Sequence, residues 1–473
     1  MNKAFEINGF WWLPESPQTK IPGTLSFSPG NILRLNLMGA LNEIEEKKFP
    51  SSNFINPNII LGISSEGKSV TLIKCLQTGG FSSFSDAGSF YSTKFIVHIA
   101  FFGVHLFSSE NILFSSITVK FHNLDNWYNE SLIKSVIHDS NSSSFTFKDS
   151  PSIEIELEDY LIQLVVYISQ NYELNNISLN TNVLIEISSK FEKSFEDYMN
   201  LTRLIQNFLT FSISSPTFVT EMHGRIGKDE IGEEKNSSVI DVEIFYGAVG
   251  WQPVAHNIFW ADMLIPYKEI ESDFARLLKN WIEKAEILKP VYDLYFASSY
   301  RAFYPENEFL NLTQALETYH RRTYDGKFQS DEYFFNGLYK KLVSCIPSDL
   351  SEDFKLSLIN GKLKYANEYS LRKRILLLSE HVAENMSLNF IHEKNKRILF
   401  AETVTNTRNY LTHYSPDLKE KAITSGEDLF KLNQQLDLLL KFCLLEELGI
   451  PFQKINELLK RDKNYKENFI SPS

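Results

Sequence analysis

The sequence contains few cysteines, no long hydrophobic run and no excess of basic residues. Its three cysteines, Cys75, Cys345 and Cys443, lie far apart and show no CxxC or Cys/His spacing. A disulfide framework and a structural zinc site are therefore not expected, and a reducing cytoplasm is the predicted compartment. No apolar stretch approaches the roughly 20 residues of a membrane-spanning helix, and the start of the chain lacks the apolar core of a signal peptide.

The net charge of −12 argues against a surface that binds nucleic acid throughout. The charge is uneven, because residues 361–400 carry more basic than acidic side chains. A local basic face can still meet phosphate, although a solvated helix face gives the same pattern. The candidates for RNA contacts in this stretch are Arg372, Arg374, Lys394 and Lys396.

One stretch, Gly62-x-x-x-x-Gly67-Lys68-Ser69, matches the phosphate-binding P-loop pattern. A P-loop must open directly into a helix, whose N-terminal N–H groups face the phosphates. The residues that follow, Val70-Thr71-Leu72-Ile73, are mostly β-branched and favour a strand. We therefore predict a β-hairpin in which Gly67 supplies a positive φ, and no nucleotide hydrolase.

Strand and helix patterns divide the chain into a β-rich front and a helical back. In the front, short β-branched and aromatic runs alternate with Gly, Pro, Asn and Ser, which is typical of a sandwich-like or barrel-like β domain. In the back, apolar residues recur with the 3.6-residue period of helices. The predicted fold class is α+β, with a β-rich domain followed by an all-α bundle. Helices are expected at 191–211, 267–300, 308–324, 331–345, 370–385, 394–413 and 427–448, with the prolines of the second half near helix ends.

The back contains two matches to Arg-x(4–6)-His, a pattern that is weak by itself. Arg374 and His381 lie inside one strongly helical run, which favours a solvated or half-buried stripe. Arg408 and His413 instead precede Ser415-Pro416, which should end the helix and let the pair converge, and Asn409 adds a neighbouring polar group. We therefore take Arg408, Asn409 and His413 as the candidate catalytic residues.

The segment Thr407-Arg408-Asn409-Tyr410-Leu411-Thr412-His413-Tyr414 resembles the Arg-polar-x3-His motif of the HEPN superfamily in its ApeA-like branch. The run from Phe309 to Arg321 is similar to the helix that opens that domain, and Ser370-Leu-Arg-x-Arg-Ile resembles a segment midway along it. The front resembles the ApeA N-terminal domain through Gly9-Phe-Trp-Trp-Leu-Pro-Glu15, Pro22-Gly-Thr-Leu25 and Leu35-x-Leu-x-Gly39. The β-rich front and the helical back of the chain thus resemble the same family independently.

The resemblance implies a metal-independent ribonuclease of bacterial abortive-infection defence against phage. His413 would be the general acid/base, because an imidazole titrates near neutrality. Arg408 would clamp the phosphate, since a guanidinium fork matches its oxygens, and Asn409 would orient His413 or the phosphate. Glu317 and His320 are possible accessory residues, although such a pair on an amphipathic helix is more often structural. No cofactor or metal is expected.

The resemblance also implies an organisation and partners. We expect a β-rich ApeA-type sensor domain at 1–260, a helical connector at 261–304, a HEPN-type ribonuclease domain at 305–460 and a tail at 461–473. RNA, with tRNA named by family analogy, is the expected substrate, and a phage-derived molecule, most simply a protein, is the expected trigger. The cutting species should be at least a dimer, because one histidine supplies one titratable group where two proton transfers are needed.

Other functions remain open at this stage. The same fold can serve as a non-catalytic RNA-binding or protein-interaction module. A nucleotide-dependent switch rests on Lys68 alone. Trp11-Trp12 is either a stacking platform for a base or an aromatic anchor in the core of the first strand, and the second interpretation is favoured.

Overall fold

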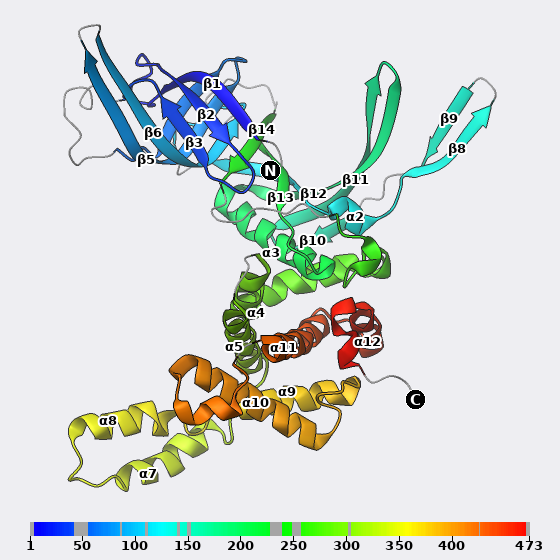
Figure 1. The fold of residues 1–473 in the computed structure, drawn as a ribbon. Coiled ribbons are helices and arrows are strands. Elements are labelled where there is room, and N and C mark those ends of the chain that lie inside the picture. Colours follow the sequence, from blue (N-terminus) through cyan, green and yellow to red (C-terminus); the bar gives the residue numbers. More distant parts are fainter. Residues whose placement is uncertain are drawn as a thin grey trace. The chain divides into compact units, whose positions relative to one another are not determined.

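In the computed structural model the chain forms two compact units, Met1–Ile282 and Glu283–Ser473. The structure describes residues 4–41, 55–85, 88–108, 112–139, 142–148, 153–227, 239–247, 257–300, 304–424 and 426–469. The first unit is β-rich and the second is helical, which confirms the predicted fold class (Figure 1). No helix in these ranges is both long and apolar enough to cross a lipid bilayer.

Six strands of the first unit close into a barrel. β1 pairs with β2 and with β4, while β6 pairs with both β3 and β5, so the strand order returns to its start. Leu33, Leu35 and Leu37 of β3 point inward and alternate with outward polar residues, the period-2 pattern of a half-buried strand. The strands are β1 (Phe5–Trp12), β2 (Ile21–Phe27), β3 (Leu33–Leu37), β4 (Ile59–Ser64), β5 (Ser69–Ser85) and β6 (Gly88–Phe102).

The P-loop-like stretch forms the hairpin between β4 and β5, as predicted. Ile63 lies opposite Ser69 and Gly62 opposite Val70, so the chain enters a strand where a P-loop needs a helix. Gly67 has φ 82° in the turn, and Lys68 is exposed beside Glu66. Gly62 is needed for packing, because a Cβ there would overlap the indole ring of Trp11.

Trp11 is an anchor of the barrel core and not a stacking platform. Its side chain is fully buried, and its Nε1 donates to the carbonyl oxygen of Gly23 at 3.1 Å. Trp12 is also buried, so neither ring is available to a nucleic-acid base.

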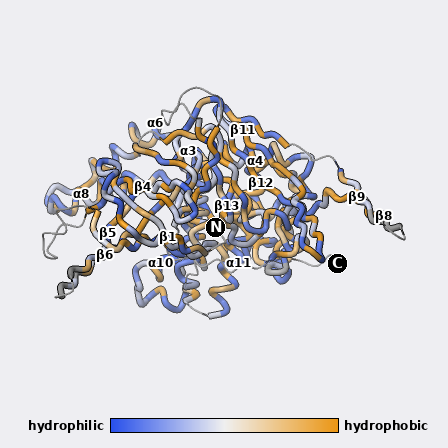
Figure 2. Tube along the Cα trace, turned by 90° about the horizontal axis from the view of Figure 1, so that it is seen from above, coloured by the Kyte–Doolittle hydropathy of each residue, from blue (hydrophilic) through white to orange (hydrophobic). Residues whose placement is uncertain are grey.

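The rest of the first unit extends the sheet beyond the barrel. Its strands are β7 (Leu113–Phe121), β10 (Ile153–Glu156), β11 (Tyr160–Glu173), β12 (Asn176–Ser194), β13 (Val219–Gly227) and β14 (Val239–Tyr246), with a separate hairpin of β8 (Ile133–Asp139) and β9 (Ser142–Phe147) and a short helix α2 (Leu124–Tyr128). Buried residues alternate with less buried ones in the middle of β11 and β12. Figure 2 shows hydrophobic and hydrophilic residues along the whole chain. Helix α3 (Phe195–Ile213) packs on β7 and β12. It begins later than predicted, because β12 continues to Ser194, whose side chain forms a capping box with Asp197.

The helical unit contains the predicted helices of the back and two that were not predicted. Helix α8 was missed because it is short and has no buried stripe, and α12 because Pro451 was interpreted only as the end of the preceding helix, whereas it is also the N-cap of the next. Pro290 lies inside α4 and not near an end, so the helix lacks one backbone hydrogen bond there.

The helices are α4 (Phe274–Tyr300), α5 (Pro305–Thr323), α6 (Asp331–Tyr333), a π-helical turn η4 (Phe334–Tyr339), α7 (Lys340–Ser344), α8 (Glu352–Gly361), α9 (Leu371–Asn385), α10 (Lys394–His413), α11 (Gly426–Glu447) and α12 (Phe452–Arg461). The 3₁₀ turns of the described residues are η2 (Trp260–Asp262) and η3 (Tyr267–Glu269) in the first unit, and η5 (Leu363–Tyr365), η6 (Pro416–Lys421) and η7 (Lys463–Asn468) in the helical unit.

Within this unit, α5 packs against α11 and α9 against α10. The apolar stripes of α10 and α11 are buried in the bundle core. The segment between α5 and α9, residues 330–366, forms a helical hairpin built from α6, η4, α7 and α8, which extends from the bundle (Figure 1). We call this hairpin the arm.

Candidate functional site

The candidate catalytic residues lie at the C-terminal end of α10. The helix ends at His413 as predicted, and Tyr414 closes it in the left-handed conformation with φ 52°. Ser415 is extended, which is the conformation that a following proline favours. Thr407 is buried, and its hydroxyl accepts a hydrogen bond from the backbone N–H of Ile423 at 3.0 Å. This contact ties the helix end to the segment that follows η6.

Arg408 is half-buried on α10, and its Nη1 donates to the Oδ1 of Asn409 at 3.1 Å. Asn409 therefore orients the arginine, whereas the sequence predicted that it would orient His413 or a phosphate. A guanidinium has five N–H donors, and this contact uses one of them. The remaining donors of Arg408 suit the oxygens of a phosphate.

His413 is exposed and does not face Arg408 within one chain. Both residues belong to a regular helix, so their side chains project about 140° apart around its axis. The buried stripe of α10, which includes Val404 and Leu411, lies nearer to Arg408 than to His413. The convergence expected at a helix end does not occur, because the helix continues through His413 itself.

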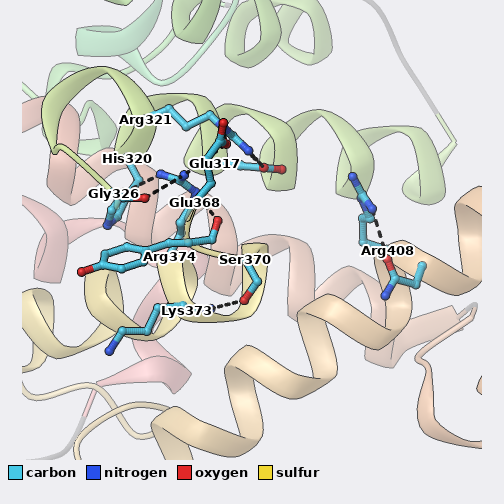
Figure 3. Close-up of polar contacts among 11 residues, drawn as sticks. Glu317, His320, Arg321, Gly326, Glu368, Ser370, Lys373, Arg374 and Arg408 are labelled. Carbon is cyan, nitrogen blue, oxygen red and sulfur yellow. Dashed lines mark hydrogen bonds and ion pairs between the residues drawn. The ribbon is translucent and has the colours of Figure 1, made fainter. Parts of the chain in front are cut away.

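A second polar cluster lies where α5, α9 and the base of the arm meet (Figure 3). Arg374 of α9 is only 1% exposed. Its Nη1 contacts Nδ1 of His320 at 3.1 Å, its Nε donates to the carbonyl of Tyr369 at 3.0 Å, and its Nη2 donates to the carbonyl of Gly326 at 3.4 Å. The nearest carboxylate, that of Glu368, is 4.0 Å from Nη2. The guanidinium is thus held mainly by neutral acceptors.

His320 is buried beside this cation, and burial together with the charge of Arg374 lowers its pKa from 6.5 to about 4. An arginine can only donate, so Nδ1 of His320 must carry a lone pair and the ring is neutral. A neutral, buried imidazole at this position is a structural hydrogen-bond acceptor. This agrees with the structural role that the sequence pattern favours for His320 over a catalytic one.

Glu317 belongs to an ion-pair chain on the solvent side of the same cluster. Its carboxylate is 3.1 Å from Nη2 of Arg321, and Arg321 also pairs with Glu368. Within the described ranges of the chain, no contact joins Glu317 or His320 to Arg408 or His413. Both accessory candidates therefore lie in the cluster around Arg374, apart from the end of α10.

The four basic residues predicted to contact RNA have different environments. The prediction that Arg374 contacts RNA is wrong, because its guanidinium is buried and already binds two carbonyls and a histidine. Arg372 forms an ion pair with Glu402 at 2.7 Å, and Lys396 lies 3.4 Å from Glu393. Lys394 is exposed in the first turn of α10.

The base of the arm is a short two-stranded neck, formed by residues 326–329 and 367–369. The backbone N–H of Phe328 donates to the carbonyl of Asn367 at 2.9 Å, and that of Tyr369 donates to Gly326 at 2.8 Å. The side-chain amide of Asn367 bonds the backbone of Gln329 in both directions, at 2.9 and 2.8 Å. Arg374 closes the neck by binding one carbonyl from each strand.

No sequence pattern singles out Gly326, Tyr369 or Asn367. Their partners lie some 40 residues away along the chain, across the arm, and such pairing leaves no periodic signal. The one available signal was the position of Gly326 directly after Asp325, a dipeptide typical of turns.

Comparison with known families is consistent with this geometry. The family model described as ApeA N-terminal domain 1 matches residues 6–281, and the model described as Apea-like HEPN matches residues 310–454. The second match contains both the end of α10 and the cluster around Arg374. No curated protein and no solved structure matches the chain.

Proposed function

Because the chain belongs to the ApeA-like HEPN family, we propose that it is an anti-phage effector that cleaves RNA without a metal ion. HEPN domains are generally ribonucleases. The observation that carries the proposal is the end of α10, where Arg408 and the exposed His413 lie five residues apart inside the HEPN match, and where Arg408 uses one of its five donors in contacts with the described residues.

The proposed reaction uses the 2′-hydroxyl of RNA as the nucleophile. A base removes the proton from the 2′-oxygen, which attacks the adjacent phosphorus, and an acid delivers a proton to the departing 5′-oxygen. The products are a 2′,3′-cyclic phosphate and a 5′-hydroxyl. His413 serves the proton transfers, and Arg408 neutralises the charge that develops on the phosphate oxygens. Asn409 holds the guanidinium in place.

We propose that two copies of the chain form one cutting site. His413 and Arg408 point about 140° apart on one helix, so a single α10 presents them to different sides. The buried stripe of α10 is used inside the bundle, which leaves its outer face, with the exposed Leu399 and His413, for a second copy. A two-fold pair would bring two histidines to one phosphate, one for each proton transfer.

This composite site has a direct test. Specific activity should fall on dilution through the dissociation range, and excess His413→Ala chain should suppress wild-type activity after subunit exchange. Full activity from a verified monomer would contradict the composite site.

The β-rich unit is the proposed sensor, and it restrains the helical unit until a phage-derived protein binds. A permanently active ribonuclease would harm the uninfected cell, so an equilibrium favouring the inactive state is required. Expression of residues 274–473 alone should therefore be more toxic to bacteria than the full chain. Low toxicity of this soluble fragment would mean that the front is needed for activity.

Expression in bacteria also separates this function from a non-catalytic RNA-binding or protein-interaction module. The full chain, induced together with a phage challenge, should arrest growth and degrade cellular RNA, with tRNA as the first species to examine. Arg408→Ala and His413→Ala should each relieve the arrest. Protection that persists in both variants would favour the non-catalytic module.

A further inference from the structure

Three lysines at the base of the arm have no acidic partner among the described residues, unlike several basic residues around them. Lys327, Lys355 and Lys396 each form an ion pair, with Asp331, Glu352 and Glu393. In contrast, no carboxylate among the described residues lies within ion-pair distance of the unpaired lysines. These are Lys362 and Lys364, which flank the start of η5, and Lys373, in the first turn of α9.

The unpaired lysines are interleaved with aromatic rings. The ammonium of Lys364 lies 5.9 Å from the ring centroid of Tyr365, which is 53% exposed, and that of Lys373 lies 6.0 Å from the ring of Tyr369. Phe328, also largely exposed, meets Tyr369 edge-on with centroids 4.8 Å apart. In Figure 3 Lys373 points away from the carboxylates of Glu317 and Glu368. We call Lys362, Lys364, Tyr365, Tyr369 and Lys373 the neck patch.

The neck patch rests on rigid backbone. Tyr369 donates its N–H to Gly326 and receives a hydrogen bond from Arg374 on its carbonyl, so the segment that carries the patch is fixed at one end. Ser370 caps α9 by accepting from the N–H of Lys373. The buried Arg374 thus positions the patch without touching its surface. A preorganised surface loses less conformational entropy when a ligand binds.

We propose that the neck patch binds single-stranded RNA and delivers it to the cutting site, an inference that rests on the proposed function for the choice of substrate. Unpaired lysines attract backbone phosphates without having to break an existing ion pair. The exposed Tyr365 offers a stacking platform to an unpaired base, and lysines next to such a ring are the combination that single-strand binders use. The patch lies in a protein of net charge −12, so its positive field is local and directs the strand to one place.

The test compares two triple variants with equal loss of charge in the full-length His413→Ala background, which prevents cleavage. The neck triple carries Lys362→Gln, Lys364→Gln and Lys373→Gln. The control triple carries Lys284→Gln, Lys289→Gln and Lys355→Gln, three lysines that form ion pairs. Affinity for a short, labelled, unstructured oligoribonucleotide is measured by fluorescence anisotropy over a range of salt concentrations.

The neck triple should bind the oligonucleotide about 10-fold to 100-fold more weakly at low salt, and its log–log salt slope should be smaller by about 2, from three phosphate contacts at roughly 0.7 each. Tyr365→Ala alone should weaken binding about fivefold or more at every salt concentration, because stacking is not screened. The control triple should retain nearly all of its affinity. Equal losses of affinity in the two triples, or unchanged affinity in the neck triple, would overturn the proposal. The three lysines would then be assigned to binding an acidic protein partner.

The outcome is separable from that of the proposed function. Binding of RNA through the neck patch with no cleavage by either the full chain or residues 274–473 would refute the nuclease and retain the patch. Cleavage by wild-type protein, with the same KM in the neck triple as in the control triple, would retain the nuclease and refute the patch.

Discussion

The guanidinium of Arg374 donates to Nδ1 of His320, 3.1 Å away and 54 residues apart in the chain. The contact joins α9 to α5 at the base of the arm. It exists only while the imidazole is neutral, because a protonated ring would present a second cation to the arginine.

The stability of the helical unit should therefore depend on pH through His320. The folded pKa of about 4 lies below the 6.5 of an unfolded histidine, so the unfolded chain binds more protons between these values. The contribution is fully present above pH 6.5 and is lost as the pH falls toward 4, for a total of roughly 3 kcal/mol. Urea unfolding at several pH values measures it. His320→Gln, which retains an acceptor, should reduce the slope by about one proton, and an unchanged slope would contradict this account.

Replacing Arg374 should lower the free energy of unfolding more than replacing its neighbour Arg372. Arg374→Met removes the side-chain donor to the carbonyl of Tyr369, one of the two donors to the carbonyl of Gly326 and the donor to Nδ1 of His320, and should cost about 3 kcal/mol of unfolding free energy. Arg372→Met is the matched control, since it removes a surface pair with Glu402 and should cost less than about 1 kcal/mol. Denaturant midpoints of the two variants make the comparison. Equal small losses would mean that Arg374 is not a structural residue.

Two glycines of the helical unit should respond in opposite ways to alanine. Gly326 has φ 62°, and a Cβ there would overlap Nη1 of Arg374, so Gly326→Ala should destabilise the neck by about 2–4 kcal/mol. Gly337 lies in helical backbone with no atom near a new Cβ, and Gly337→Ala should be neutral or stabilising by up to about 1 kcal/mol. Thermal unfolding of both variants distinguishes them, and a harmless Gly326→Ala would be inconsistent with the neck geometry.

The P-loop-like stretch should have no nucleotide function. Lys68→Ala removes an exposed side chain at the β4–β5 turn and should change neither melting temperature nor defence against phage. ATP at 100 times a dissociation constant would stabilise a binding protein by about 2.7 kcal/mol, which a thermal scan detects. A nucleotide-dependent rise that Lys68→Ala removes would restore the P-loop.

Much of the fold could be predicted from the sequence because its patterns are local. The hairpin at Gly62–Ser69 followed from the β-branched residues after the glycine turn, and α10 followed from its apolar period and the Ser-Pro stop. Helix α8 could not be predicted, since its hairpin buries too little apolar surface to leave a stripe.

The environments of the site residues were harder to predict than their helices. Arg374 and Arg372 are two residues apart on α9 with the same charge, yet one is buried and the other is paired at the surface. What separates them is the backbone of residues 326 and 369, which comes close only when the neck forms. Likewise, the direction of the His413 side chain relative to Arg408 depends on whether α10 ends before or after His413.

Cleavage of RNA in the presence of EDTA tests the central claim, that Arg408 and His413 form a metal-independent ribonuclease site. We expect residues 274–473, which lack the proposed restraint by the β-rich unit, to leave 2′,3′-cyclic phosphate and 5′-hydroxyl ends. His413→Ala should lower the rate on the order of 100-fold or more, and Arg408→Ala by about 100-fold or more, with Arg408→Lys in between. His381→Ala, which alters only a histidine paired with Glu446 at 2.8 Å, should retain the activity of a stable fold. Cleavage that requires added Mg²⁺ and leaves 5′-phosphates, or that survives both alanine substitutions, would contradict the account.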